Sequence, residues 1–291
     1  MPALAVGCRA LAVFDAIQEA PVPTWVLYPA RAPTQMTRFG PYQLPLATDM
    51  PVVGEGLRFV VVSHGNGGTG WAHRDTAMAL ARAGFVVALL EHPGNGRSDN
   101  RLAGTAANLA NRPRHLRTVL DAVQADAEIG PRLASGDVAL IGHSIGGYTA
   151  LALAGGRPLA FARETSDGIA RPVPVESDPR VSALVLLAPA TPWFMAGGAL
   201  AAVEQPIFMR TGEQDIVTPE WHADIVRTGV PDPQRVDHRV VPGAGHFSFQ
   251  SPFPPEMLRS DFPPAHDPPG FDRAAYQSVL NAEIIHFLRA V

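Results

Sequence analysis

Apolar runs of strand length that alternate with helix-like segments place the strongest constraint on how this chain folds. The runs are almost wholly apolar and end in glycine-rich or proline-rich turns; they cover 57–63 (LRFVVVS), 85–90 (FVVALL), 137–141 (DVALI) and 181–187 (VSALVLL). Segments with helical spacing lie between them at 72–83, 112–127 and 145–155. Strands that are apolar on both sides are typical of a parallel sheet covered by helices on both faces. We therefore predict an α/β fold with a mostly parallel central sheet.

The flanking segments extend this pattern toward both ends. Residues 4–14 and 22–28 are rich in β-formers around a proline-containing turn, which predicts an N-terminal antiparallel hairpin. Residues 29–57 are rich in Pro and Gly and predict a loop with a short strand near 42–46. Two more strands and a closing amphipathic helix are expected at 206–210, 238–241 and 271–290.

The domain organisation is expected to be simple. We find no internal repeat and no break in composition, so residues 1–291 are predicted to form a single domain. Two loop-rich segments, 158–179 and 248–269, have the character of insertions, and the second is stiffened by many prolines. The helix at 112–127 is expected to start after Arg112-Pro113.

The composition excludes several chemistries. All 23 basic residues are arginine, which rules out a Schiff-base lysine, a P-loop lysine and a Ser-Lys dyad. The single cysteine, Cys8, cannot form an intrachain disulfide and has no reactive-cysteine motif around it. No H-E-x-x-H motif is present, and we expect neither a cofactor nor a metal.

Charge and hydropathy limit the partners and the compartment. The net charge of −4 and the lack of a basic block argue against nucleic acid or an anionic membrane as a partner. The N-terminal sequence lacks the pattern of an export signal, and no apolar run reaches 18 residues. We therefore expect a cytoplasmic protein without a membrane span that acts on a small molecule. The oligomeric state is left open.

Ser144 is the candidate nucleophile. The expected strand 137–141 runs into Gly142-His143-Ser144-Ile145-Gly146, a G-x-S-x-G pattern, and a helical segment follows directly. In this arrangement the serine lies on a sharp strand-to-helix turn, and the glycines relieve crowding around it. The N-terminal amides and the positive end of the helix dipole then point toward the reacting oxygen. The pattern in this context predicts an α/β-hydrolase nucleophile.

His246 and Asp215 are the candidate base and acid. A nucleophilic serine needs a neutral imidazole as base and a carboxylate that orients it, and in this fold both follow the serine in the chain. His246 lies in the flexible loop Pro242-Gly243-Ala244-Gly245, directly after the last short strand. Asp215 lies in the loop after the strand at 206–210, and Glu213 is its competitor there.

The oxyanion hole is expected from two backbone N–H groups. One belongs to Ile145, the residue after the nucleophile, and the other to the loop His64-Gly65-Asn66-Gly67-Gly68. We assign the second donor to Asn66, with Gly67 as the alternative. Because the backbone donates, the identity of the side chain at this position is expected to matter little.

Four residues are candidates for lining the substrate pocket. Gly67 follows the predicted oxyanion donor, and His92 lies at a strand end where a purely structural turn is the competing interpretation. Trp193 and Phe194 follow the strand at 181–187 and could line an apolar pocket or simply pack beneath a surface helix.

The motifs resemble the bacterial predicted dienelactone hydrolase group, which is similar to platelet-activating-factor acetylhydrolases and polyester-cleaving esterases. The resemblance covers about residues 58–290 and rests on these segments: 63–68 (SHGNGG), 91–95 (EHPGN), 142–153 (GHSIGGYTALAL), 178–181 (DPRV), 187–190 (LAPA), 212–215 (GEQD), 245–247 (GHF) and 268–273 (PPGFDR). It implies the α/β-hydrolase fold, with Ser144, Asp215 and His246 as catalytic triad. True dienelactone hydrolases use a cysteine nucleophile, so Ser144 removes the support for a dienelactone substrate.

The predicted activity is a serine esterase. We expect cleavage of a carboxylic ester with a small or short acyl group through an acyl-enzyme on Ser144. An acyltransferase or an amidase that uses the same triad is the nearest alternative. A non-catalytic binding protein on this fold is the alternative from a different class, although all three triad positions are occupied.

Overall fold

The computed structural model describes residues 4–291, and its centre is a 10-stranded sheet with the order β14-β13-β12-β9-β7-β8-β4-β1-β6-β5. The strands are β1 (Ala5–Leu11), β4 (Thr24–Ala30), β5 (Gln35–Phe39), β6 (Tyr42–Thr48), β7 (Leu57–Ser63), β8 (Phe85–Leu90), β9 (Leu133–His143), β12 (Val181–Leu187), β13 (Ile207–Gly212) and β14 (Val236–Val241). All neighbouring pairs from β8 to β14 are parallel. The prediction of a mostly parallel sheet is confirmed.

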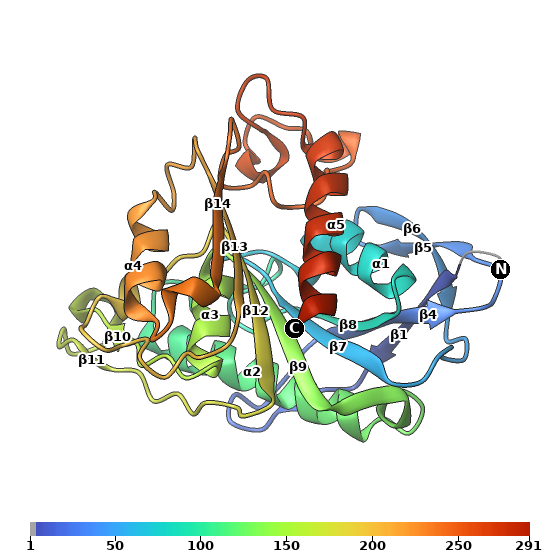
Figure 1. The fold of residues 1–291 in the computed structure, drawn as a ribbon, viewed down its shortest axis with the longest axis horizontal. Coiled ribbons are helices and arrows are strands. Elements are labelled where there is room, and N and C mark those ends of the chain that lie inside the picture. The colour runs from blue at the N-terminus through green and yellow to red at the C-terminus, as the bar shows by residue number, and fades with distance from the viewer. Residues whose placement is uncertain (1–3) are drawn as a thin grey trace.

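Helices cover both faces of this sheet. They are α1 (Arg74–Arg82), α2 (Ala106–Ala125), α3 (Ile145–Leu153), α4 (Trp221–Gly229) and α5 (Arg273–Ala290). Figure 1 shows α1 and α5 against one face and α2 and α3 against the other. The alternation along β7 explains this arrangement: Val60 and Val62 pack in the core with α1 and α5, whereas Phe59 and Val61 pack with α2 and α3.

The strand order reverses beside β7, and this reversal positions the site. The chain passes from β7 to its neighbour β8, then returns across β7 to β9 and continues outward through β12, β13 and β14. Loops after the two strands that flank such a reversal diverge and leave a crevice at the carboxyl edge of the sheet. Here these loops are the ones that follow β7 and β9. They carry the oxyanion-loop candidates and Ser144.

The N-terminal strands extend the sheet mostly in antiparallel fashion, with β1 and β6 as a parallel pair. β1 pairs with β4 in register from Ala5 opposite Ala30 to Leu11 opposite Thr24, as the predicted hairpin requires. Their connection contains a small hairpin of β2 (Phe14–Asp15) and β3 (Ala20–Pro21). The expected short strand is β6, but its antiparallel partner β5 was not predicted. Most β5 side chains are exposed, so its sequence lacks the apolar alternation that marks a strand.

The start of α2 was predicted wrongly. The helix begins at Ala106, where the Thr105 hydroxyl accepts a hydrogen bond from the Asn108 N–H, and Pro113 lies inside it. Proline lacks an N–H, so a helix-interior proline leaves the carbonyl four residues earlier without its donor. The Tyr148 hydroxyl of α3 donates to this carbonyl, that of Leu109, at 3.0 Å. A tertiary contact therefore makes an interior proline acceptable.

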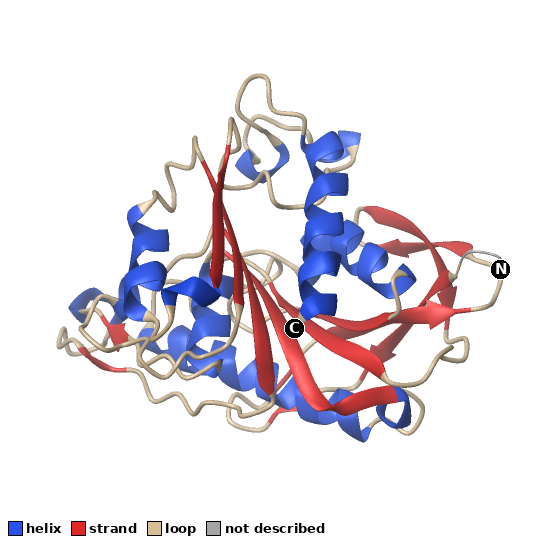
Figure 2. Cartoon of the chain, viewed as in Figure 1, coloured by secondary structure: helices blue, strands red, loops and turns tan. Residues whose placement is uncertain are grey.

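The two loop-rich segments lie on different parts of the molecule (Figure 2). Segment 158–179 contains a short two-stranded sheet of β10 (Leu159–Ala160) and β11 (Arg171–Pro172). Segment 248–269 contains two single turns of 3₁₀ helix, η6 (Pro255–Met257) and η7 (Pro263–Ala265). Within residues 4–291, no helix has the length and apolar character that crossing a membrane requires.

We predict that Tyr148→Phe lowers the free energy of unfolding by about 1–3 kcal/mol, because it leaves the buried Leu109 carbonyl unpaired. Urea unfolding measures this change. Pro113→Ala supplies a backbone N–H that can take over the bond, so the cost of Tyr148→Phe should be smaller in the Pro113→Ala background. An equal cost in both backgrounds would contradict this interpretation.

Candidate active site

Ser144 lies on a strained turn between β9 and α3. Its φ is 55° and its ψ is −123°, a combination that residues with a side chain rarely adopt. A Cβ added to Gly142 would overlap the Gly146 carbonyl, and a Cβ added to Gly146 would overlap the Ser63 carbonyl. Both glycines of the pattern are therefore required by close backbone approach, and the turn matches the one that the motif predicts.

The end of β12 holds this turn in place. The Ser144 N–H donates to the Leu187 carbonyl at 3.1 Å, and the Ala190 N–H donates to the Ser144 carbonyl at 2.9 Å. Ala188, between these two partners, itself has a positive φ of 44°. The strained serine is thus fixed from both sides by a neighbouring strand end that is also strained.

The structure brings Asp215 and His246 together. The loops after β13 and β14 place the Asp215 Oδ2 atom 2.8 Å from the His246 Nδ1 atom. Asp215 Oδ1 accepts the N–H groups of Val217 and Thr218, each at 2.8 Å. Burial raises the pKa of Asp215, but the hydrogen bonds from His246 and Thr218 outweigh burial and hold it at about 2. Asp215 is therefore a carboxylate at neutral pH.

Glu213, the competing acid, and the histidines His238 and His286 do not contact the pair of Asp215 and His246. Glu213 is exposed, and its carboxylate accepts the Gly243 N–H at 2.8 Å, which supports the His246 loop from outside. His238 contacts the Thr211 hydroxyl at 2.9 Å, and His286 is exposed on α5. The residue before Ser144 also contributes, because His143 Nε2 donates to the His246 carbonyl at 2.9 Å.

The oxyanion-loop candidates lie against the serine. A Cβ built on Gly65 would be 3.3 Å from the Ser144 Cβ, so the loop backbone lies in close contact with the serine. The Gly68 N–H donates to the Gly65 carbonyl at 3.1 Å and closes the turn. Within the described part of the chain, the backbone N–H groups of Asn66 and Ile145 have no acceptor, so both are available to a ligand.

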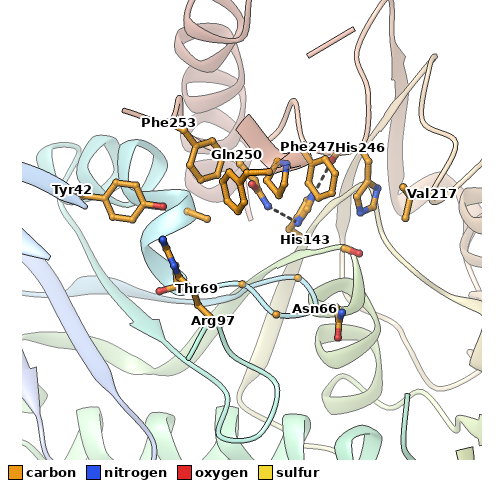
Figure 3. A pocket seen from close by; sticks show the side chains of 17 residues that line it. Tyr42, Asn66, Thr69, Arg97, His143, Val217, His246, Phe247, Gln250 and Phe253 are labelled. Atoms are coloured by element: carbon orange, nitrogen blue, oxygen red, sulfur yellow. Dashed lines mark hydrogen bonds between the residues drawn. The ribbon is translucent and has the colours of Figure 1, made fainter. Parts of the chain in front are cut away.

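A cavity of about 240 Å³ opens above these groups and contains both Ser144 and His246. Figure 3 shows its lining side chains. Segment 248–269 supplies one wall with Phe253, Phe262 and Pro264, and the Ser251 N–H donates to the Ala72 carbonyl at 2.8 Å to fasten that wall. Its other lining residues are Tyr42, Gly65, Asn66, Gly67, Gly68, Thr69, Ala72, Arg97, His143, Val217, Phe247 and Gln250.

Three of the four predicted pocket residues lie outside this cavity; only Gly67 lines it. The His92 side chain is fully buried and hydrogen-bonds to Ser63 and His115 behind the oxyanion loop. Trp193 and Phe194 pack on Tyr148 in the core of the α2/α3 face, with ring centroids 4.8 Å and 5.5 Å apart from that of Tyr148. The strand β12 ends beside Ser144, but the residues that follow it pack against the face of the sheet that α2 and α3 cover.

Sequence reasoning missed Thr218 and the aromatic wall. The Thr218 hydroxyl lies 2.7 Å from Asp215 Oδ2, 3.1 Å from His246 Nδ1 and 3.1 Å from the Ala188 carbonyl. It therefore links the acid, the base and the strained end of β12. Its position three residues after Asp215 was a usable signal, because Asp side chains commonly accept the N–H groups two and three residues ahead. Nothing in the sequence indicated which aromatic residues of 248–269 face the cavity.

Buried histidines surround the site as neutral groups. His64 Nε2 accepts the His92 N–H at 3.0 Å, and His92 Nδ1 lies 3.0 Å from His115 Nδ1. Burial lowers the pKa of His64 and His92 well below the ordinary value, and that of His115 to about 3. Across residues 4–291, no group of three His, Cys, Asp or Glu side chains is arranged to hold a metal ion.

These histidines make the fold sensitive to acid. His64, His73, His92, His115 and His143 are all buried, and burial lowers the pKa of each in the folded state. The unfolded chain, with histidine pKa values of about 6.5, binds more protons than the folded chain at mildly acidic pH. Their stabilising contribution is therefore complete above about pH 6.5 and is lost as the pH falls below it.

We predict that the urea midpoint falls clearly between pH 7.5 and pH 5. His73 offers a matched control, because neither of its ring nitrogens has a partner among the described residues and its pKa is lowered to about 4. His73→Leu removes one such group without breaking a hydrogen bond, so the dependence of stability on pH should become shallower. An unchanged midpoint between pH 7.5 and 5 would show that the histidines are not buried in neutral form.

Comparisons with known proteins support the superfamily. The model of the family described as "Serine aminopeptidase, S33" matches residues 55–164, a stretch that contains Ser144 but ends before Asp215 and His246. The carbendazim hydrolyzing esterase of Nocardioides sp. (strain SG-4G) is 36% identical over 134 residues, which are 43% of this chain and 50% of that protein. A 2-hydroxy-6-oxononadienedioate/2-hydroxy-6-oxononatrienedioate hydrolase of Burkholderia vietnamiensis (strain G4 / LMG 22486) is 37% identical over 105 residues, 35% of this chain and 32% of that protein. The chain thus matches half or less of the length of these curated relatives.

Solved structures extend the likeness over the whole chain at the level of the fold. A ferulic acid esterase from Streptomyces cinnamoneus superposes with a TM-score of 0.66 at 16% identity, covering 97% of this chain and 88% of that one. A dienelactone hydrolase-like promiscuous phosphotriesterase from metagenomic libraries gives 0.60 at 16% identity, covering 98% and 99%. This chain has the α/β-hydrolase fold, and the matches together support a hydrolase of the α/β-hydrolase superfamily.

Proposed function

We propose that the protein is a serine esterase that cleaves a carboxylic ester through an acyl-enzyme on Ser144. The observation that carries this proposal is one cavity that contains both a serine on a strained strand-to-helix turn and a histidine hydrogen-bonded to a buried carboxylate. A serine, a base and an orienting acid in this arrangement are the requirements for nucleophilic acyl transfer.

In the first half-reaction, the Ser144 Oγ attacks the ester carbonyl carbon while His246 Nε2 takes the serine proton. Asp215 stabilises the resulting imidazolium through its hydrogen bond to Nδ1. The carbonyl oxygen becomes an oxyanion, and the N–H groups of Asn66 and Ile145 stabilise it. When the intermediate collapses, the bond between the carbonyl carbon and the alcohol oxygen breaks, and His246 gives its proton to the leaving alkoxide.

In the second half-reaction, water takes the place of the alcohol. His246 removes a proton from the water as its oxygen attacks the acyl carbon, and the same two N–H groups hold the second oxyanion. Collapse releases the carboxylic acid, and Ser144 regains its proton from His246. The reaction consumes one water for each ester bond, and the chain needs no further reactant.

The cavity favours a small, largely apolar acyl or alcohol group. Its volume is about 240 Å³, and Phe247, Phe253, Phe262 and Val217 make its walls apolar. The names of the carbendazim hydrolyzing esterase and the ferulic acid esterase agree with ester chemistry on this fold. The aminopeptidase description of the matching family keeps an amidase as the second candidate.

We predict that the wild-type protein hydrolyses p-nitrophenyl acetate and butyrate faster than longer esters and faster than the matching anilides. Ser144→Ala should lower kcat by about 10⁶-fold, because it removes the nucleophile. Covalent labelling by a fluorophosphonate, read by mass spectrometry at Ser144, provides an independent readout. Faster cleavage of anilides would favour the amidase, and an unlabelled Ser144 in folded protein would exclude acyl transfer at this residue.

We predict that Asp215→Asn lowers kcat on the order of 10⁴-fold, because it keeps the shape of the acid but stabilises the wrong tautomer of His246. Asp215, whose pKa is about 2, is a carboxylate at neutral pH, so the substitution removes a charge that orients the base. Steady-state kinetics with p-nitrophenyl acetate measures the change. An Asp215→Asn variant with near wild-type kcat would argue against this role.

A further inference from the structure

We propose that the Asn66 side chain, in addition to its backbone N–H, donates a hydrogen bond to the oxyanion, and that Arg112 and Asn95 fix the amide in this orientation. The proposal rests on the proposed esterase activity and adds a catalytic residue to it. It departs from the expectation that only the backbone of Asn66 matters.

The chain of contacts begins at a buried cation. Arg112, on α2, is fully buried, and among the described residues no carboxylate lies within ion-pair distance of its guanidinium. Its neighbours are neutral oxygens: it donates to the Thr149 hydroxyl at 2.9 Å, the Asn95 Oδ1 at 2.6 Å, the Ser63 hydroxyl at 3.2 Å and the His64 carbonyl. A buried cation without a counter-ion is costly, so a role in stability alone does not account for it.

Arg112 determines how the side-chain amide of Asn95 is oriented. A guanidinium only donates hydrogen bonds, so the Asn95 atom that faces Arg112 must be the oxygen. This settles the orientation of the Asn95 amide, which is otherwise ambiguous between oxygen and nitrogen. The Asn95 NH₂ group then donates both of its hydrogens, to the Oδ1 atoms of Asn66 and Asn100, each at 2.7 Å.

The same reasoning settles the Asn66 amide. Its Oδ1 atom accepts from Asn95, so its NH₂ group lies on the opposite side of the side chain. Asn66 lines the cavity of Ser144 and His246, and in Figure 3 its nitrogen lies on the side toward the cavity and its oxygen on the side away from it. Within residues 4–291, this NH₂ group has no hydrogen-bond acceptor. Asn66 is exposed, so this donor is held at the cavity where it is open to solvent or to a ligand.

The chain of hydrogen bonds from Arg112 through Asn95 to Asn66, called the relay below, also strengthens the Asn66 NH₂ group as a donor. The dipoles of Asn95 and Asn66 are aligned head to tail behind the Arg112 charge, and aligned hydrogen bonds polarise one another. Arg112 also binds the His64 carbonyl of the oxyanion loop and the Thr149 hydroxyl, which donates to the Ile145 carbonyl at 2.9 Å. Both predicted backbone donors are therefore tied to the same cation. A fixed donor of this kind stabilises the charge that develops in the transition state more than the neutral ester.

The first test removes the donor and keeps the backbone N–H. Asn66→Ala should lower kcat for p-nitrophenyl acetate by about 10²–10³-fold with a smaller change in KM, as loss of one oxyanion donor does. The affinity for an alkylboronic acid, which forms a negatively charged tetrahedral adduct on Ser144, should fall in parallel. Asn100→Ala is the matched control, because Asn100 accepts the other Asn95 hydrogen but does not line the cavity, and its kcat should stay within about threefold of wild type.

The second test breaks the relay between Asn95 and Asn66. Asn95→Asp is isosteric and gives Arg112 a carboxylate partner, but it cannot donate to Asn66. The thermal midpoint should therefore be unchanged or raised, while kcat and boronate affinity fall at least tenfold because the Asn66 amide is no longer held. In the Asn66→Ala background, Asn95→Asp should have little further effect on kcat. A purely structural role of Asn95 would instead lower the thermal midpoint together with activity.

Two outcomes would overturn the proposal: Asn66→Ala with kcat within about threefold of wild type, or an Asn95→Asp variant that loses activity only in proportion to its fluorophosphonate-reactive fraction. Either result with an inactive Ser144→Ala variant would leave the esterase proposal intact. An active Ser144→Ala variant would instead refute the esterase proposal and this inference together.

Discussion

The hydrogen bonds between the Ser144 turn and the end of β12 support the remaining parts of the site. A serine with φ of 55° stays in that conformation only if its surroundings stabilise it, and such strain commonly costs about 1–3 kcal/mol. Leu187 and Ala190 hold both backbone groups of Ser144, while the Ala188 carbonyl between them accepts from Thr218. Because Thr218 also contacts Asp215 and His246, the strain at the serine and the position of the acid and base depend on the same strand end.

The opposite side of the site depends on buried polar groups rather than on apolar packing. Arg112 and the neutral histidines lie beneath the oxyanion loop, where they satisfy backbone and side-chain groups that would otherwise be unpaired. Such a network holds a loop in one geometry, but it is a weak source of stability because each group has lost its hydration. The apolar layers around α1 and α5 and around α2 and α3 provide the stability that this network does not.

Much of the fold was predictable because the relevant signals are local. The apolar runs marked the strands of the parallel sheet, and the chain order of Ser144, Asp215 and His246 matched the order of their strands. Prediction failed where a distant contact overrides a local rule. Pro113 lies inside α2 because Tyr148 satisfies the carbonyl that proline leaves free, and β5 pairs with β6 despite an exposed sequence. His92, Trp193 and Phe194 were assigned to the pocket from nearness in sequence, but His92 and Phe194 are buried and Trp193 packs against the core.

The sequence by itself determined the α/β architecture, the Ser144 turn and the candidate acid and base. These features follow from side-chain periodicity and from glycine spacing, which act over a few residues and need no knowledge of distant contacts. The tertiary structure alone decided which groups face the cavity, how segment 248–269 closes it, and that Arg112 lies buried without a carboxylate partner. A hydrogen-bonded relay depends on the relative placement of α2 and the loops after β7 and β8, and the packing of the whole domain sets that placement.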